Sequence, residues 1–279
     1  MKVIGIGDNV VDDYIHIRKM FPGGNALNFS VYASMLGCHS AYLGVFGSDV
    51  AARHVQRTLR EMGVDISHCR IEEGPNGRAI LSIEDGERVF ISSNEGGVGK
   101  SVSMEFIFDD PDYLQTFSIA HTSTYSYLDE HLARLQQHNP LISYDFSDDF
   151  DSDHALSLCQ HIDIGFFSCA ERTEEGTMDL LERAVGRGCK MAVATRGPHE
   201  AILFEGRSWF RQVPKTLVPR DTLGAGDAFI SGFLVSYVGS KADSSVHRNS
   251  LIESSLEKAV AFAAKICQEQ GAFGHGLTY

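Results

Sequence analysis

The segment with the clearest chemical potential runs from Asp221 to Phe229 and reads DTLGAGDAF. Its small residues Gly224, Ala225 and Gly226 allow several backbone N–H groups to converge on one point. An apolar run at helical spacing follows, so the positive end of a helix would face that point and hold phosphate oxygens without side chains. Asp227 lies in the first turn of this helix. A carboxylate there repels phosphate, but it is well placed to take a proton from a hydroxyl group that attacks the phosphate.

Taken alone, this segment also fits an ordinary loop followed by a helix that an Asp caps. However, it resembles the second signature of the ribokinase (PfkB) family of carbohydrate kinases. A second segment, GGNALN from Gly23 to Asn28 and on to Gly37, resembles the first signature of that family. The two segments occur in the expected order. The resemblance therefore implies a kinase that transfers phosphate from ATP with Mg²⁺, using Asp227 as the base and the backbone of 224–226 as the anion cradle.

Composition limits the possible partners. The 279 residues contain 24 Lys plus Arg against 37 Asp plus Glu, a formal net charge of −13, and no basic cluster. This balance argues against nucleic acid and anionic membrane as partners, and no apolar stretch approaches the length that a bilayer requires. The six cysteines are scattered without ligand spacing, which predicts reduced thiols in a cytoplasmic protein.

Short apolar runs alternate with helical patterns, which predicts an α/β fold with a doubly wound, mainly parallel sheet and helices on both faces. Because no linker-like stretch divides the chain, we expect one domain over 1–279. The expected strands are 3–7, 41–45, 117–121, 141–145, 162–167 and 190–194. The expected helices are 25–35, 50–61, 130–137, 153–160, 174–186 and a long one with an apolar face over 252–267.

The segment 78–92 breaks this alternation. Two strands around Asp85-Gly86 predict a hairpin outside the main sheet. The family resemblance implies that this hairpin belongs to a small β lid that covers the sugar and forms a homodimer contact. Only a short stretch lies between Tyr14 and Pro22, so we expect a reduced lid, contributed mainly by 78–92.

The resemblance places the sugar-binding residues near the N-terminus. Asp12 would bind sugar hydroxyls, and its neighbour Asp13 is the competing assignment. Gly23 and Gly24 would let the sugar approach the backbone closely. A solvated loop acid is the alternative interpretation for either Asp.

Two asparagines and one arginine complete the sugar side. Asn25 and Asn28 lie three residues apart, on one face of the expected helix. Asn28 matches the family's sugar-binding Asn, whereas Asn25 also fits a helix N-cap. Arg88 on the hairpin is a lid cation that would meet the substrate or its new phosphate. The alternative interpretation of Arg88 is a solvated charge on an edge strand.

The nucleotide side rests on the same resemblance. Thr195 and Gly197 follow a predicted strand and resemble the turn that lies along ATP, where they would act together with Gly224 and Gly226. A generic loop is the alternative. Ser168-Cys169-Ala170-Glu171 occupies the place of an Asn-x-x-Glu motif, so Glu171 would help to organise hydrated Mg²⁺.

Two features leave the metal assignments open. Ser stands where the family motif has Asn, and Glu174 and Glu175 are close enough to compete with Glu171. Asp221, together with Gly271-Ala272 after the last helix, resembles the family's monovalent cation site, which implies K⁺ as a further cofactor.

The segments 7–12, 23–28, 88–90 and 145–148 look like the bacterial fructoselysine 6-kinase branch of the family. That likeness implies phosphorylation of a primary hydroxyl, at position 6, of a fructosyl amino acid. One alternative is a kinase for a free sugar or sugar acid, such as ribose, fructose or 2-keto-3-deoxygluconate. The other is a non-catalytic sugar-binding regulator on the same fold.

Overall fold

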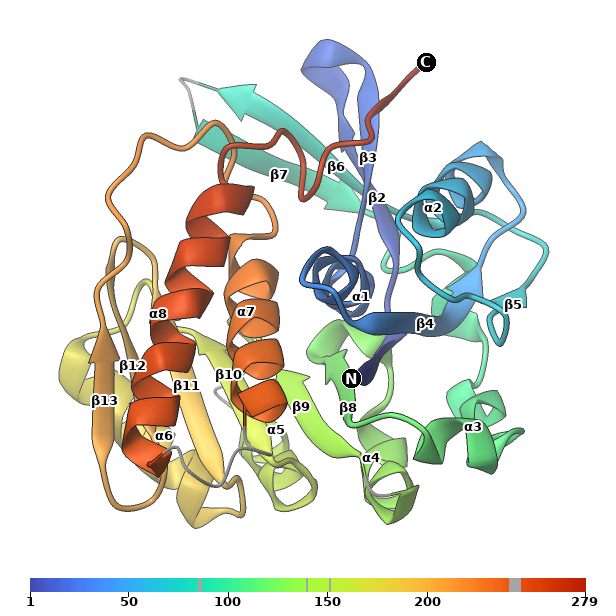
Figure 1. Ribbon diagram of the computed structural model, residues 1–279. Helices are drawn as coiled ribbons and strands as arrows, with labels where there is room; N and C mark the ends of the chain where they lie inside the picture. Colours follow the sequence, from blue (N-terminus) through green and yellow to red (C-terminus); the bar gives the residue numbers. More distant parts are fainter. Residues whose placement is uncertain (85–86, 139, 151, 241–246) are drawn as a thin grey trace.

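The computed structural model describes residues 1–84, 87–138, 140–150, 152–240 and 247–279, and two β-sheets organise them (Figure 1). The order of the main sheet is β13 (Trp209–Gln212), β12 (His199–Phe204), β11 (Met191–Arg196), β10 (Ile164–Ser168), β9 (Leu141–Asp145), β8 (Ile119–Ser123), β1 (Lys2–Gly7), β4 (His39–Phe46) and β5 (Arg70–Ile71). All neighbouring pairs from β11 to β5 are parallel, whereas β12 pairs antiparallel with both its neighbours. The predicted doubly wound, mainly parallel sheet is confirmed.

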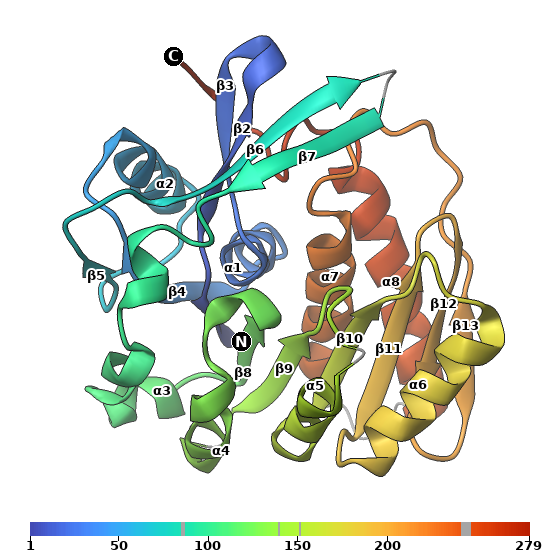
Figure 2. The ribbon, with the colours of Figure 1, turned by 180° about the vertical axis from the view of Figure 1, so that it is seen from behind.

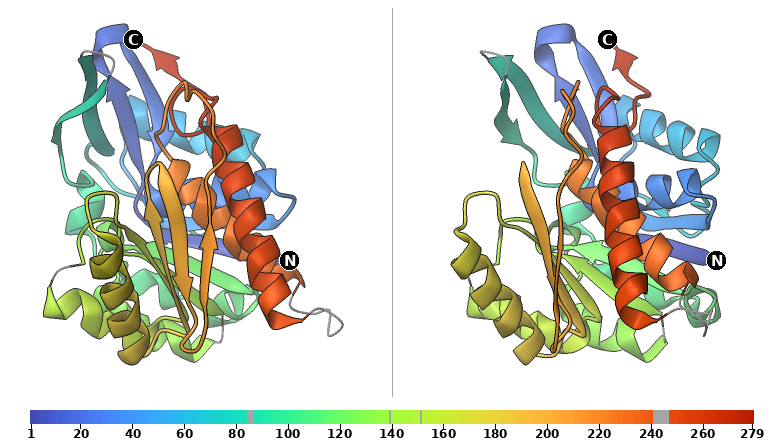
Figure 3. Two further views of the ribbon diagram at one scale, coloured as in Figure 1. Left: turned by 90° about the vertical axis from the view of Figure 1, so that its left-hand side faces the viewer. Right: turned by 60° about the vertical axis from the view of Figure 1, so that its left-hand side comes forward.

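Helices cover both faces of the main sheet (Figures 1 and 2). One face carries α1 (Asn25–Met35), α7 (Ala225–Ser240) and α8 (Arg248–Ile266), with α2 (Val50–Glu61) next to α1. The opposite face carries α3 (Pro111–Gln115), α4 (Leu132–Leu135), α5 (Asp153–Ser157) and α6 (Glu174–Gly186). The side views in Figure 3 show the sheet between these two helical layers.

The helix predictions differ in how well their ends were placed. α1, α2 and α6 begin and end at the predicted residues. The expected helix 130–137 is instead the single turn α4 between two 3₁₀ turns, and α5 also ends in a 3₁₀ turn. Such tightening is common at the ends of short helices, because it pairs backbone groups that lack a partner in the helix.

The second sheet is larger than the reduced lid that the sequence suggested. Its order is β14 (Leu277–Thr278), β3 (Lys19–Gly23), β2 (Val10–Tyr14), β6 (Gly77–Glu84) and β7 (Glu87–Ser93). A 3₁₀ turn of only three residues, Ile15–Ile17, joins β2 to β3, which leaves room for two full strands. The hairpin expected over 78–92 corresponds to β6 and β7, the two longest strands of this sheet, and β2, β3 and β14 extend it. The predicted Asp85-Gly86 turn lies outside the described residues.

α1 connects the two sheets. All of its residues from Ala26 to Ala33 are buried, so it is enclosed around its whole circumference rather than along one stripe. It packs against β1 and β4 of the main sheet and against α7. Its N-terminus directly follows β3 of the lid sheet, so the first turn of α1 lies where the two sheets meet (Figure 1).

In the described part of the chain, no helix is both long and apolar enough to cross a bilayer. All six cysteines are free thiols.

Candidate active site

The predicted anion loop ends at the N-terminus of α7. Gly224 has φ +74, a conformation that side chains other than glycine rarely adopt. A Cβ at this position would lie 2.4 Å from Tyr32 Oη and 2.9 Å from Ala272 Cβ. The Tyr32 hydroxyl is itself fixed, because it donates a hydrogen bond of 2.6 Å to the carbonyl oxygen of Ala272. Glycine is therefore required at 224 by both backbone conformation and space.

Asp227 lies in the first turn of α7 with 8% of its surface exposed. Asn28 Nδ2 donates a hydrogen bond of 2.7 Å to Asp227 Oδ2, so the two predicted signatures meet in the fold. Burial raises the pKa of Asp227 well above its ordinary value, and the negative charge of Asp145 adds to this effect. A carboxylate with a raised pKa holds a proton more strongly, which suits a general base.

Asp145 is a residue of this site to which the sequence analysis assigned no role. Its Oδ2 accepts a hydrogen bond of 2.7 Å from Asn25 Nδ2, and its Oδ1 accepts one of 2.8 Å from the backbone N–H of Ser147. Burial raises the pKa of Asp145 to about 6. Asn25 thus has a side-chain partner inside the site.

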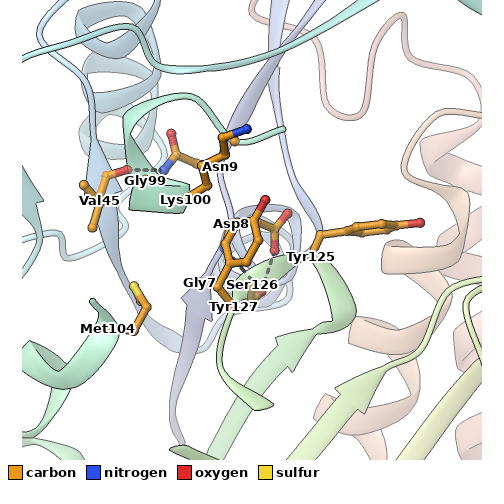
Figure 4. Close-up of a pocket in the computed structure, with 11 residues that line it drawn as sticks. Gly7, Asp8, Asn9, Val45, Gly99, Lys100, Met104, Tyr125, Ser126 and Tyr127 are labelled. Carbon is orange, nitrogen blue, oxygen red and sulfur yellow. Dashed lines mark hydrogen bonds between the residues drawn. The ribbon is translucent and has the colours of Figure 1, made fainter. Parts of the chain in front are cut away.

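Asp8 is the second residue without an assigned role. Its carboxylate accepts hydrogen bonds from the backbone N–H groups of Asn25 (2.6 Å) and Ala26 (3.1 Å) and from the Ser123 hydroxyl (3.1 Å). It also accepts one from the Ser126 hydroxyl (2.8 Å), which lies beside it in Figure 4. Asp8 therefore supplies the acceptor that the first turn of α1 needs.

This arrangement corrects the alternative interpretation of Asn25. The N-cap position of α1 is Gly24, with φ +113, and Asn25 is the first helical residue. The signal for Asp8 and Asp145 was present in the sequence, because each lies at the carboxyl end of a parallel strand. Ligands of open α/β sheets bind at that edge.

The structure distinguishes between Asp12 and Asp13 by the face of β2 on which each lies. Asp13 accepts hydrogen bonds from Arg78 and from the Tyr279 hydroxyl, the latter at 2.6 Å. Asp12 lies on the opposite face, where a Cβ added to Gly23 would come within 2.1 Å of its Oδ2. Its charge also contributes to the raised pKa of Asp227. Asp12, Gly23 and Gly24 thus lie together above the first turn of α1.

Beside Asp8 the wall of the site contains a cavity of about 20 Å³, shown in Figure 4. Asn9 lines it, and its Nδ2 donates hydrogen bonds to Tyr42 Oη (2.9 Å) and to the carbonyl oxygen of Val45 (2.8 Å). The volume suits about one water molecule. We therefore regard this cavity as part of the wall rather than as a substrate site.

A much larger cavity, of about 690 Å³, opens on the other side of the anion loop. Thr195, Gly197 and Gly226 line it, as predicted for a nucleotide site, together with Ala225. Gly224, which was also predicted for the nucleotide site, does not line this cavity and lies against Tyr32 instead. The rest of the wall comes from β11, β12 and the turn between them, from the end of β13 and the loop after it, and from α7, α8 and the residue after α8. These residues are Arg196, Pro198, His199, Ala201, Gln212, Val213, Pro214, Lys215, Thr216, Leu217, Pro219, Thr222, Phe229, Val260, Ala263, Ala264 and Cys267.

Glu171 lies on an exposed turn after β10. The backbone N–H of Cys169 donates a hydrogen bond of 2.8 Å to the carbonyl oxygen of Thr195, which holds this turn against the predicted nucleotide turn. Glu174 forms ion pairs with Arg211 (2.6 Å) and Arg196 (3.9 Å). These pairs leave Glu171 better placed than Glu174 as a candidate. In the described residues, no group of three or more Asp, Glu, His or Cys could hold a metal ion.

Asp221 holds three segments together. Its carboxylate accepts hydrogen bonds from Tyr14 Oη in the lid (2.7 Å), from Leu223 N in the anion loop (3.0 Å) and from Gly271 N after α8 (3.0 Å). The expected approach of 271–272 to the anion loop is thus present. Arg88 lies in β7 opposite Ile83, but its side chain is outside the described part of the structure, so its role stays a prediction.

Comparisons with known proteins agree with this geometry. The model of the family described as pfkB family carbohydrate kinase matches residues 6–274. Fructosamine kinase FrlD of Bacillus subtilis (strain 168) is 38% identical, over 100% of this chain and 95% of that protein. Fructoselysine 6-kinase of Escherichia coli (strain K12) is 32% identical, over 96% and 98%. A solved fructokinase with bound ATP from Xylella fastidiosa has a TM-score of 0.82 at 18% identity, over 98% and 94%. The predicted ribokinase-like fold is confirmed.

Proposed function

The chain belongs to the pfkB family of carbohydrate kinases, and we propose that it transfers the γ-phosphoryl group of ATP to the 6-hydroxyl of a fructosyl amino acid. The observation that carries the substrate class is the full-length similarity to a fructosamine kinase and a fructoselysine 6-kinase, each above 30% identity. The likeness to fructokinase, at 18% identity, supports the fold alone.

In the proposed reaction Asp227 takes the proton from the primary hydroxyl as its oxygen attacks the γ-phosphorus. The contact from Asn28 fixes the carboxylate, and its raised pKa favours proton uptake. The backbone amides of 224–226 would stabilise the charge on the transferring group, because they lie at the N-terminus of α7, where the positive end of the helix dipole favours an anion. Asp12, Gly23 and Gly24 would hold the sugar hydroxyls from the lid side.

ATP would occupy the 690 Å³ cavity, whose lining includes the predicted Thr195, Gly197 and Gly226. Mg²⁺, when bound, neutralises negative charge on the phosphates. The described residues fit an ion that is held mainly by phosphate oxygens and water, since they offer no cage of side chains. Glu171 would contact that ion through water.

We further propose that a monovalent cation such as K⁺ orders the anion loop near Asp221. The support is the convergence of the lid, the anion loop and the segment after α8 on this one carboxylate. The test compares kcat in K⁺ and in a bulky organic cation at matched ionic strength. We expect a decrease of several-fold in the organic cation, about 1 kcal/mol, and equal activity would reject the cation site.

The lid would also form a homodimer contact. β7 leaves Phe90 and Ile91 exposed, by 61% and 49%, and an exposed apolar strand invites pairing with a second copy. Sedimentation of the wild type and of Phe90→Asp tests this proposal. A dimer that the substitution dissociates supports it, whereas a wild-type monomer overturns it.

The function itself is tested by ATP consumption across fructoselysine, fructose, ribose and 2-keto-3-deoxygluconate. A site whose polar groups lose their partners discriminates strongly, so we expect kcat/KM for free fructose to be lower by about 10²-fold or more. The position of the phosphate is read from phosphorus–proton coupling in the product. Equal or better turnover of a free sugar would reject the fructosyl amino acid and leave the kinase assignment intact. Binding without any turnover would favour a non-catalytic regulator.

A further inference from the structure

We infer that Asp145 recognises the protonated secondary amine that joins the sugar to the amino acid, and that this contact separates fructosyl amines from free sugars. The inference rests on the proposed function, because that function supplies a substrate with an amine at carbon 1. An alkylated amine of this kind carries a positive charge near neutral pH.

The sugar end of the site carries negative charge that its own described residues do not neutralise. The hydrogen bonds to Asp8, Asp145 and Asp227 come from backbone N–H groups, serine hydroxyls and asparagine amides. Among the residues that the structure describes, no lysine or arginine forms an ion pair with any of the three. A positively charged ligand would relieve their mutual repulsion, whereas a neutral sugar would not.

A second, independent feature shows that a ligand belongs here. Asn28 is 4% exposed, and its Oδ1 is buried without a hydrogen-bond partner in the described structure. The other end of the same amide contacts Asp227, so Oδ1 lies at the site. A buried acceptor without a donor is costly, which indicates that a bound molecule supplies the donor.

Hydrogen-bonding capacity selects Asp145 over Asp8 as the carboxylate for the amine. A carboxylate can accept about four hydrogen bonds. Asp8 already accepts four, two from the first turn of α1 and two from serine hydroxyls. Asp145 accepts two, from Asn25 and from the backbone of Ser147, one on each oxygen. Asp145 therefore keeps lone pairs on both oxygens for a ligand.

α1 holds both this carboxylate and the base, each through one asparagine side chain. Asn25 and Asn28 are three residues apart on α1, so their Cβ atoms are about 5–6 Å apart. Asn28 contacts Asp227, and Asn25 contacts Asp145, each at 2.7 Å. The two carboxylates are thus held by side chains about one helical turn apart on the same face of α1, a spacing comparable to the length of a hexose. With its 6-hydroxyl at Asp227, the sugar would bring the amine on carbon 1 toward Asp145.

The same contact would assist the chemical step. The negative charge of Asp145 raises the pKa of Asp227, second only to the effect of burial. An ammonium group beside Asp145 offsets that charge and increases the ionised fraction of Asp227 at neutral pH. Part of the discrimination should therefore appear in kcat as well as in KM. Simple loss of a binding contact would change KM alone.

The first test uses the unmodified enzyme and two matched sugars, 1-propylamino-1-deoxyfructose and 1-O-propylfructose. They have the same length, lack the other charges of an amino acid, and differ in the group attached to carbon 1. Because a hydrogen bond to a charged group is involved, we expect kcat/KM to be about 10- to 100-fold higher for the amine. Equal values for the two sugars would overturn the inference.

The second test compares Asp145→Asn with the control Asp148→Asn, which removes an exposed carboxylate three residues away. Asp145→Asn should reduce the preference for the amine to within about threefold, whereas Asp148→Asn should retain it. Thermal unfolding and calorimetric binding of a non-hydrolysable ATP analogue establish that each variant is folded. If Asp145→Asn does not fold, Asp145→Ser takes its place. The comparison of the two sugars on the wild-type enzyme tests the inference independently of either variant. A preference that survives the loss of Asp145 contradicts the inference.

Failure of the proposed function gives a different result. In that case the unmodified enzyme would favour fructose over fructoselysine. Failure of the present inference would leave fructoselysine preferred while Asp145→Asn slowed both substrates equally.

Discussion

The two ends of the candidate active site are built from opposite kinds of residue. The sugar end gathers the carboxylates of Asp8, Asp12, Asp145 and Asp227. The nucleotide cavity has no Asp or Glu among its described lining residues, which include Arg196, His199 and Lys215. Because of this difference, one site can hold two polar ligands in a fixed order. A nucleotide polyanion is repelled from one end and tolerated at the other.

The two ends also differ in the structure that supports their residues. At the sugar end, side chains on α1 and on the main strands are fixed by hydrogen bonds to one another. At the nucleotide end, much of the wall is the stretch 213–219, which contains no helix or strand. The turn 225–227 is the boundary, since Ala225 and Gly226 face the cavity and Asp227 meets Asn28. We expect substitutions at the two ends to affect different kinetic constants.

The largest effect is expected at the boundary. Asp227→Asn should lower kcat by about 10²- to 10⁴-fold, the usual contribution of a positioned base, while binding of an ATP analogue is retained. Because Asp227 is a buried carboxyl with a raised pKa, the same variant should unfold at a higher temperature at pH 8. Steady-state kinetics and calorimetry provide both readouts. A variant with near-normal kcat would remove Asp227 from the reaction.

The charge at the sugar end should make stability depend on pH. The pKa of Asp145 rises from 3.8 to about 6 on folding, so between these values the folded state binds more protons than the unfolded state. Stability contributed by this group is therefore present at low pH and lost as pH rises through about 6, by up to about 3 kcal/mol.

Denaturant unfolding of the wild type and of Asp145→Asn at pH 4.5 and 7.5 measures this effect. The variant should gain stability relative to the wild type at the higher pH. A difference in unfolding free energy that is the same at both pH values would show that Asp145 does not titrate as described.

The anion loop offers a matched pair of glycines. Gly224→Ala places a methyl group against Tyr32 Oη in a left-handed backbone conformation, so we expect a loss of about 1–3 kcal/mol in stability and about 10-fold or more in kcat/KM. Gly226→Ala, where a Cβ would meet nothing within 4 Å, should change stability by less than about 0.5 kcal/mol. Equal stability losses in the two variants would contradict the steric argument.

The smallest effect is expected within the nucleotide cavity. Ala264→Phe fills part of the space beside α8 and should raise KM for ATP by about 10-fold, while KM for the sugar stays within about twofold. Lys265→Phe, on the exposed side of the same helix, is the control. If both substrates lost affinity equally, the two ends would not be independent.

Local patterns in the sequence were sufficient to predict part of this molecule. The helices Asn25–Met35, Val50–Glu61 and Glu174–Gly186 were predicted at their observed ends. The last two have helical periodicity after a capping residue, whereas the first is buried on all sides and was bounded by the glycines at 24 and 37. The proximity of Asn28 to Asp227 followed from two motifs. What failed depended on pairing between distant segments. The lid gains β14 from the other end of the chain, and no local pattern indicates that Leu277 pairs with Met20.

The same limit explains the missed carboxylates. Asp8 and Asp145 matter because β1, β8 and β9 are neighbours in the sheet, and strand order is not written in any one segment. To choose between Asp12 and Asp13, one must likewise know which face of β2 points toward the first turn of α1. The partners of Asp13, Arg78 and Tyr279, place it on one face, and Gly23 lies beside Asp12 on the other.

The distances along the chain between contacting residues have a consequence for how the protein acquires its activity. Asn28 and Asp227 are 199 residues apart, and Tyr14 and Asp221 are 207 apart. Contacts of such separation form late and slowly, because the intervening chain must first be ordered. Helices such as α6 need only local contacts. During refolding, the helical circular-dichroism signal should therefore return before phosphoryl transfer does, so the appearance of activity reports the final joining of the two halves of the chain.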